Sequence, residues 1–171
     1  VSIATYDDSH CDLILKAINF GKHIFVEKPL CISQKEFDLI SDVLTKKPDI
    51  KISSNLILRK TPRFITLKNQ IERGEFGEVY YLEGDYDYGR INKIIEGWRG
   101  NIPNYSVVHG GAIHLIDLIL WLLGKKVVEV FAFGTNIATQ KTSFKGNNDT
   151  VASLLKFENG TIAKITANFP C

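Results

Sequence analysis

The first 54 residues alternate between strand-like and helix-like segments, and this alternation constrains the fold more than any other feature of the chain. Short apolar runs at residues 1–5, 23–27 and 50–54 are typical of buried strands. The two segments between them place apolar side chains at helical spacing. A strand–helix–strand–helix–strand order requires parallel crossovers, so the sequence predicts an α/β fold with a parallel sheet covered on both faces.

The ends of these two helices are marked by capping residues. Asp8 or Ser9 is placed to cap the first helix, and Gly21 is placed to end it in the left-handed conformation. Ser33 followed by Glu36 three residues later is the pattern of a capping box, which predicts the start of the second helix.

The pattern changes after Asn55, where strands begin to follow strands. We expect a helix at 62–72, a strand at 78–88, an irregular loop at 89–105 and a helix from Gly111 to Leu123. Strands are expected at 127–135, 150–157 and 161–169, the last two joined by a hairpin at residues 158–160. The sequence therefore predicts two domains, residues 1–54 and residues 55–171, the second an α+β domain with a mostly antiparallel open sheet.

The tripeptide Glu27-Lys28-Pro29 ends the second predicted strand. Proline lacks an N–H group and cannot continue a strand ladder, so it fixes where the strand stops. Ligands of open α/β sheets bind at the carboxyl edge, where this acid and this lysine are expected to lie. Two solvated charges that only cap the strand are the alternative interpretation.

The predicted helix at 111–123 is apolar apart from His114 and Asp117. A helix that is apolar all round is buried, and a buried carboxylate is costly unless it is paired. The two polar residues are three positions apart, which puts them on one helix face. Either they form a structural pair that anchors the helix, or a carboxylate fixes the tautomer of a reactive imidazole, and we favour the second interpretation.

Bulk properties exclude several classes of function. The net charge is +2 with both signs interspersed, so no nucleic-acid partner is expected. No apolar run approaches the roughly 20 residues that cross a bilayer, and no membrane role is expected. Cys11, Cys31 and Cys171 have no metal-ligand spacing, which predicts no metal site and reduced thiols in the cytoplasm. The sequence has no methionine, and we expect an internal fragment of a longer protein.

Several stretches of the chain together resemble one family, that of glucose–fructose oxidoreductase, inositol dehydrogenase and the rhizopine-catabolism proteins (Gfo/Idh/MocA). The resemblance covers essentially the whole chain. Its residues, in order, are Ile3-Ala4-Thr5, His10, Gly21-Lys22-His23, Glu27-Lys28-Pro29, Asn55, Arg59, Pro62, Gly74, Gly77, Trp98-Arg99, Gly110-Gly111, His114, Asp117, Asp149, Phe157 and Gly160.

The resemblance implies an NAD(P)-dependent dehydrogenase acting on a CH–OH group of a sugar, cyclitol or nucleotide-sugar derivative. Residues 1–54 would be the C-terminal part of a doubly wound Rossmann domain that binds NAD or NADP. Residues 55–171 would form the substrate domain, whose open sheet serves as a homo-oligomer interface. The catalytic residues would be Lys28 and His114. Thr5, Tyr6, His10, Glu27, Lys28 and Pro29 would bind the cofactor, and Arg99, His109 and Asp117 would bind the substrate.

Two positions depart from the family's pattern. None of the thirteen glycines forms the Gly-x-Gly-x-x-Gly phosphate loop. Gly110 stands four residues before His114, where many members have an aspartate, and His109 is a candidate substitute. This glycine motivates a second hypothesis, a non-catalytic or regulatory oligomerising protein on the same fold. For Arg99, a structural stack on Trp98 remains an alternative to binding a substrate anion.

Overall fold

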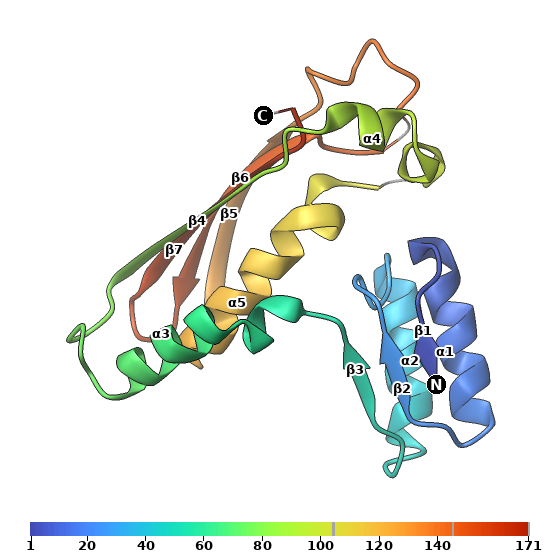
Figure 1. Cartoon of the computed structure of the whole chain (residues 1–171), viewed down its shortest axis with the longest axis horizontal. Helices are drawn as coiled ribbons and strands as arrows, with labels where there is room; N and C mark the ends of the chain where they lie inside the picture. The colour runs from blue at the N-terminus through green and yellow to red at the C-terminus, as the bar shows by residue number, and fades with distance from the viewer. Residues whose placement is uncertain (104, 145, 171) are drawn as a thin grey trace. The chain divides into compact units, whose positions relative to one another are not determined.

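The computed structural model describes residues 1–103, 105–144 and 146–170. The chain divides into two compact units, Val1–Leu56 (unit 1) and Ile57–Cys171 (unit 2) (Figure 1). The sequence predicts a domain boundary between residues 54 and 55, where the alternation of strands and helices stops.

Unit 1 is built on a three-stranded parallel sheet, as the sequence predicted. The strands β1 (Ser2–Ile3), β2 (Ile24–Val26) and β3 (Ile52–Ser54) lie in the order β1-β2-β3. Helices α1 (His10–Asn19) and α2 (Gln34–Thr45) form the two crossovers and contact each other. Apolar side chains of α1 and β2 dominate the core, whose buried members are Ile3, Cys11, Ile14, Ala17, Ile18, Ile24, Val26 and Ile40.

Only one face of this sheet is covered within unit 1, which corrects the expectation of helices on both faces. Because the strand order advances in one direction, two crossovers of the same hand place both helices on the same side. Ile24 and Val26 point into the core, whereas Phe25 between them points the other way and is 46% exposed.

The predicted helix ends are confirmed in two cases out of three. Ser33 Oγ accepts a hydrogen bond from Glu36 N at 3.3 Å, although the Glu36 carboxylate turns back to Ile32 N rather than to Ser33 N. Gly21 has φ +66° after the last turn of α1. Ser9 is the N-cap of α1, but its hydroxyl makes no bond to the first helical N–H groups.

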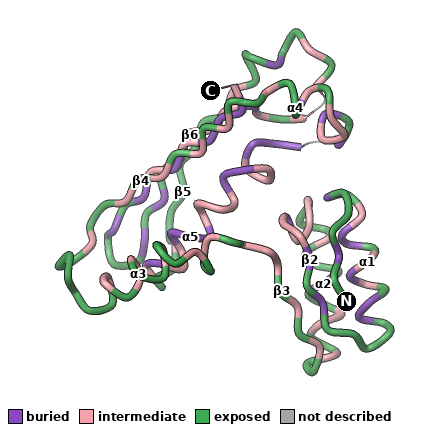
Figure 2. Tube along the Cα trace, viewed as in Figure 1, coloured by how far each residue is buried: buried purple, intermediate pink, exposed green. Residues whose placement is uncertain are grey.

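Unit 2 contains a four-stranded mixed sheet in the order β4-β7-β6-β5. The strand β6 (Thr150–Phe157) runs antiparallel to β5 (Val127–Thr135) and to β7 (Ile162–Asn168). The strand β4 (Tyr81–Asp87) pairs with β7 in parallel, so the sheet is mostly antiparallel, as predicted, with one parallel pair. Helix α5 (Ile113–Leu123) packs on β4, β7 and α3 (Pro62–Glu72), and buried residues gather between it and the sheet (Figure 2).

The connection between β4 and α5 is more regular than predicted. The expected loop at 89–105 contains a short helix α4 (Ile91–Ile95) and a 3₁₀ turn η3 (Trp98–Asn101). A π-helical turn η4 (Val108–Ala112) leads directly into α5, which begins at Ile113 rather than at Gly111. Two further 3₁₀ turns are η1 (Asp7–Ser9) and η2 (Ile57–Lys60). No helix in the described part of the chain has the length and apolar character that a bilayer crossing requires.

Candidate functional site

Polar residues converge at the carboxyl edge of the parallel sheet in unit 1. The three parallel strands end at the same edge, so the residues that follow them become neighbours. Thr5 and Tyr6 follow β1, Glu27-Lys28-Pro29 follows β2, and Asn55 follows β3. With His10 at the start of α1, the structure brings together all six residues that the sequence singled out for cofactor binding.

His10 is fully buried and connects two of the segments at this edge. Its Nδ1 lies 2.7 Å from the carbonyl oxygen of Pro29, and its Nε2 lies 3.3 Å from the carbonyl oxygen of Thr5. A carbonyl oxygen only accepts hydrogen bonds, so the shorter contact assigns a proton to Nδ1. The imidazole therefore donates a hydrogen bond to the Lys28–Pro29 turn, whose peptide bond is cis, and its Nε2 lies close to Thr5, which follows β1.

Glu27 is fixed by hydrogen bonds on both sides. Its N–H donates to the carbonyl of Ile3 at 2.9 Å, which extends the ladder past the end of β1. Its carboxylate oxygen Oε1 accepts from the side-chain amide of Asn55 at 2.7 Å. Lys28 next to it is half-buried. The acid is thus oriented by the neighbouring strand, and the lysine sits in a defined position at the edge rather than on a loose loop.

The buried acid of unit 2 is paired with an arginine from another segment. Asp117 on α5 is 8% exposed. Arg59 Nε donates to Asp117 Oδ2 at 2.7 Å, and an Arg59 terminal nitrogen donates to Oδ1. This bidentate arrangement satisfies both carboxylate oxygens and ties η2 to α5. The hydrogen bonds that Arg59 donates to Asp117 raise the pKa of the guanidinium, so the cation stays charged at all ordinary pH values.

Sequence reasoning paired Asp117 with His114 and missed Arg59 as its partner. Residues 59 and 117 are 58 positions apart, and no periodic pattern relates them. The position of Asp117 in an apolar helix did indicate that such a partner exists, because a buried carboxylate needs a cation or several hydrogen-bond donors.

His109 and His114 lie on successive turns of one continuous helical segment. His109 is within the π-helical turn η4, and His114 is the second residue of α5. Both residues are half-buried, and the Nδ1 atom of each is shielded from solvent. π-Helical turns are rare and occur often at functional sites.

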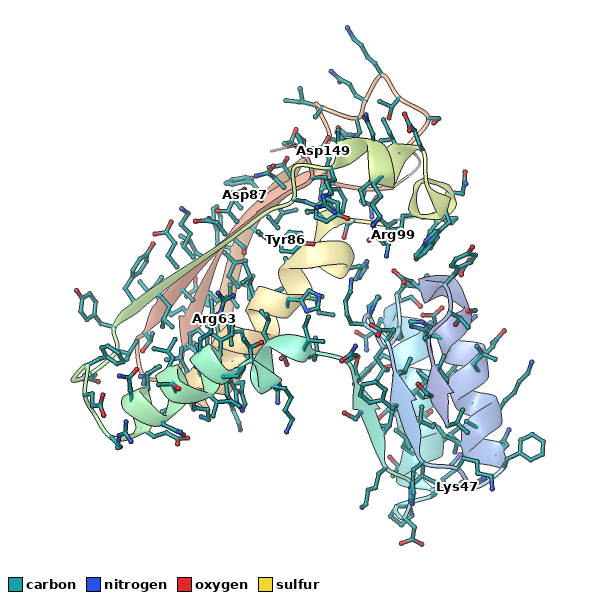
Figure 3. All side chains as sticks on the ribbon, viewed as in Figure 1. Lys47, Arg63, Tyr86, Asp87, Arg99 and Asp149 are labelled. Carbon is teal, nitrogen blue, oxygen red and sulfur yellow. The ribbon has the colours of Figure 1, made fainter. Side chains whose placement is uncertain are left out.

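Arg99 stacks on its neighbour Trp98, with the guanidinium carbon 4.2 Å from the ring centroid. Arg99 at η3 and Tyr86 on β4 lie at the same end of unit 2 (Figure 3). Burial raises the pKa of the Tyr86 phenol, and the charge of Arg99 opposes this increase. Of the residues described, no Asp or Glu lies within ion-pair distance of Arg99.

The predicted site residues therefore fall into two groups. Unit 1 holds Lys28 with the other residues of its sheet edge, and unit 2 holds Arg99, His109, His114 and Asp117. Within residues 1–103, 105–144 and 146–170, no three His, Cys, Asp or Glu side chains gather in a way that could hold a metal ion.

The fold and these two groups define an α/β protein in which a Rossmann-type parallel sheet precedes a mixed-sheet domain with a histidine-bearing helix. Residues 1–54 match the model of an oxidoreductase family with an NAD-binding Rossmann fold, and residues 64–171 match the GFO/IDH/MocA C-terminal domain. The chain belongs to the Gfo/Idh/MocA family, as the sequence motifs indicated.

Relatives of known name include inositol dehydrogenases. The chain is 28% identical to myo-inositol 2-dehydrogenase of Thermotoga maritima over 96% of its own length and 48% of the relative. It is also 28% identical to scyllo-inositol 2-dehydrogenase (NAD(+)) of Bacillus subtilis, over 98% of its own length and 48% of the relative. The chain thus spans about half the length of these curated relatives.

A crystal structure of myo-inositol 2-dehydrogenase from Lactobacillus plantarum has the same fold. It superposes with a TM-score of 0.87 over 98% of this chain and 50% of that chain, at 24% identity. At this level of identity the similarity supports the fold.

Proposed function

We propose that the protein is an NAD- or NADP-dependent dehydrogenase that oxidises a CH–OH group of a cyclitol, a sugar or a nucleotide-sugar derivative. The observation that carries this proposal is the convergence of Thr5, Tyr6, Glu27, Lys28 and Asn55 at the carboxyl edge of a parallel sheet. Membership of an oxidoreductase family and the names of the inositol dehydrogenase relatives support the same reaction class.

The residues at this sheet edge would serve a bound dinucleotide in two ways, some by direct contact and others by shaping the edge. Thr5 and Tyr6 are exposed and Glu27 and Lys28 are half-buried, so these four can contact a bound ligand. His10 and Pro29 are buried, and we assign them the shaping of the edge rather than direct contact. The bound cofactor would supply the hydride-accepting nicotinamide, and this chemistry belongs to the cofactor.

The remaining chemistry is the removal of the substrate's hydroxyl proton. The Lys28 ammonium can donate a hydrogen bond to the reacting oxygen and polarise it, while His114 accepts the proton. Asp117 was expected to bind substrate, but both of its oxygens bond Arg59. We therefore assign Asp117 to fixing the helix that carries His114, and we keep His109 as a substrate-binding candidate.

Arg99 is proposed to bind an anionic group of the substrate, such as a carboxylate or a phosphate. The guanidinium is always charged and is half-buried on the Trp98 ring, with no Asp or Glu of the described residues as its ion-pair partner. A planar, preoriented guanidinium of this kind suits bidentate recognition of a carboxylate or phosphate.

The decisive experiment substitutes Lys28 in the full-length protein. Lys28→Ala should lower kcat by roughly 10²- to 10⁴-fold, because one positioned proton-transfer group is lost, and should leave dinucleotide binding measurable by fluorescence. Lys22→Ala is the matched control, since Lys22 is exposed on the turn that precedes β2. Unchanged turnover in Lys28→Ala contradicts the proposal. Failure to reduce NAD(P) with any of a panel of polyols and sugars favours the regulatory alternative.

We also propose that the protein forms a homo-oligomer through the outer face of the unit 2 sheet. Phe131, Leu154, Lys164 and Glu83 form one row across this face, because each is the register partner of the next. Phe131 and Phe133 are 58% and 72% exposed and contact each other edge to face. Apolar side chains interspersed with ion pairs such as Lys164–Glu83 suit a self-complementary surface.

The oligomer is tested by placing charge on this face. Phe133→Asp should shift the sedimentation coefficient of the full-length protein towards that of a smaller species, because a charge would enter an apolar contact. Phe76→Asp, at an exposed phenylalanine between α3 and β4, is the control and should not change sedimentation. An unchanged assembly in Phe133→Asp contradicts this interface.

The cysteines support a reducing compartment, and we propose the cytoplasm. Cys11 and Cys31 are both free thiols in unit 1. Proteins that work outside the cell use such residues more often in disulfides.

A further inference from the structure

Two successive glycines occupy the middle of the π-helical turn that precedes α5. Gly110 and Gly111 lie within η4, between His109 and the first residue of α5. Among the residues that the structure describes, six glycines have positive φ, and these two are not among them. Backbone conformation therefore does not demand glycine here, and the reason must lie in the space around each Cα.

That space is filled by two tyrosines. A methyl group on Gly110 would overlap the hydroxyl oxygen of Tyr105 and would lie 3.2 Å from Phe169 Cζ. A methyl group on Gly111 would overlap the ring edge of Tyr86. Favourable carbon contacts begin at about 3.5 Å, so neither position has room for a side chain while the tyrosines stay in place.

The tyrosines are held by a continuous row of aromatic rings. Tyr86 stacks on Tyr88 with centroids 5.9 Å apart, and Tyr88 meets Phe169 edge to face at 6.1 Å. Phe169 then stacks on Tyr105 with centroids 6.1 Å apart and ring planes 7° from parallel. Tyr105 and Phe169 are 2% and 1% exposed, so their rings cannot swing aside into solvent.

The backbone around Tyr105 is fixed as well. The carbonyl of Tyr105 accepts a hydrogen bond from Asn147 N at 2.6 Å, and Val107 N donates to the carbonyl of Asn148 at 3.1 Å. Two backbone hydrogen bonds to residues 147 and 148 therefore hold the chain where it enters the π-helical turn.

We infer that Tyr86 and Tyr105 are positioning residues that clamp the π-helical turn and so set where His109 and His114 stand. Tyr86 and Tyr105 lie at the two ends of one aromatic row, and their rings fill the space beside the adjacent Cα atoms of Gly111 and Gly110. This packing fixes the position of the turn along the helix axis. The catalytic part of this inference rests on the proposed dehydrogenase function. It further implies that position 110 cannot carry a carboxylate in this chain, so acid–base chemistry falls to the histidines.

The test is a double-substitution cycle in the full-length protein. Gly110→Ala should lower kcat about 10- to 100-fold with an unchanged KM for the dinucleotide, because displacement of a proton-transfer group by a fraction of an ångström impairs the reaction. Tyr105→Phe removes the overlapping oxygen, and in the Gly110→Ala background it should restore much of kcat. Gly84→Ala is the control, since its methyl group would meet Leu115 of α5 at an ordinary 3.4 Å.

A second readout does not depend on turnover. The imidazole C–H resonances of His109 and His114 should shift in Gly110→Ala and return in the double variant, whereas those of His10 and His23 in unit 1 should not move. If Gly110→Ala does not fold, Tyr105→Phe alone still leaves a gap at Gly110 and should shift the same two resonances.

The outcomes separate the clamp from the proposed function. Unchanged resonances of His109 and His114 in folded Gly110→Ala overturn the clamp, as does failure of Tyr105→Phe to restore them. Shifted and restored resonances in a protein that oxidises no polyol or sugar support the clamp and contradict the dehydrogenase proposal.

Discussion

Arg59 and Asp117 are 58 residues apart in sequence and form a two-hydrogen-bond ion pair that joins the start of unit 2 to the helix carrying His114. The carboxylate side chain is 10% exposed, whereas the guanidinium side chain is 44% exposed. The pair therefore sits at the border of the core, with the acid inside and the arginine reaching in from the surface.

Removing the arginine should destabilise unit 2. Arg59→Leu leaves the Asp117 carboxylate buried without its main donor, at an expected cost of about 1–3 kcal/mol in the free energy of unfolding. The lower half of that range is expected because Arg59 is partly solvated. Urea unfolding followed by tryptophan fluorescence measures this in the 171-residue chain, since both tryptophans, Trp98 and Trp121, lie in unit 2.

The control for this prediction is an exposed ion pair of similar geometry. Arg73 and Glu75 are 2.7 Å apart with side chains 63% and 42% exposed. Arg73→Leu should change the free energy of unfolding by less than about 1 kcal/mol. Equal effects of Arg59→Leu and Arg73→Leu would contradict the assignment of Arg59 as the partner of a buried charge.

Most of the secondary structure could be predicted from the sequence, because helix ends and strand patterns are determined by residues that are close together in the chain. The 62–72 helix and the 127–135 and 150–157 strands have the predicted bounds, since Pro62 begins the helix and alternation defines the strands. The strands of unit 1 are shorter than their apolar runs, because ladder hydrogen bonds and not hydrophobicity decide where a strand ends.

Features that depend on distant residues could not be predicted in this way. The parallel pairing of β4 with β7 joins segments about 80 residues apart, and the partner of Asp117 is a comparable case. The rings of Tyr86 and Tyr105 reach Gly111 and Gly110 of the π-helical turn through tertiary packing. For the buried acid, the sequence showed that a cation or several hydrogen-bond donors were required, but not which residue supplies them.

His10 should be needed for the geometry of the cofactor edge. His10→Leu replaces the imidazole with an apolar side chain of moderate size and leaves the carbonyl of Pro29 without its donor. We expect a loss of about 1–3 kcal/mol in unit 1 stability and a raised KM for the dinucleotide. Hydrogen exchange of peptides from residues 1–56 and steady-state kinetics measure the two effects.

His23 provides a matched comparison in the same unit. Its Nδ1 also bonds the backbone, accepting from Lys51 N at 3.1 Å, but the residue is exposed. Water can replace this bond, so His23→Leu should change stability by no more than about 0.5 kcal/mol and should leave the KM unchanged. The role assigned to His10 is wrong if both variants behave alike.

Asp149 should anchor the segment between β5 and β6. It is 1% exposed, and its Oδ2 accepts hydrogen bonds from the N–H and the hydroxyl of Thr139, both at 2.9 Å. Thr150 Oγ1 donates to its other oxygen at 3.0 Å. Asp149→Ala removes all three hydrogen bonds and should lower the free energy of unfolding by about 1–3 kcal/mol. Hydrogen exchange at the Thr139 amide should become faster.

The comparison for Asp149 is an acid on the exposed sheet face. Glu129 lies 3.6 Å from Lys156 with its side chain 69% exposed. Glu129→Ala should leave both the unfolding free energy and the exchange at Thr139 nearly unchanged. Slow exchange at Thr139 in Asp149→Ala would show that other contacts hold the segment.

The thiols of Cys11 and Cys31 should react slowly and only at alkaline pH. Burial, followed by the nearby Glu36 carboxylate, raises the pKa of both thiols above the ordinary value near 9. A raised pKa keeps a thiol protonated to higher pH, so alkylation should be slow at pH 8 and accelerate above pH 9. Cys31 is half-buried and should react before the buried Cys11.

Alkylation with iodoacetamide, followed by mass spectrometry over a pH series, measures these rates in a Cys171→Ser background, whose substituted position lies outside the described residues. Glu36→Gln removes the negative charge but keeps an oxygen that can accept from Ile32 N. This variant should lower both thiol pKa values and shift the rate increase to lower pH, because the negative charge of Glu36 no longer disfavours the thiolates. Rapid labelling of Cys11 at pH 7 would be incompatible with its burial beside Glu36.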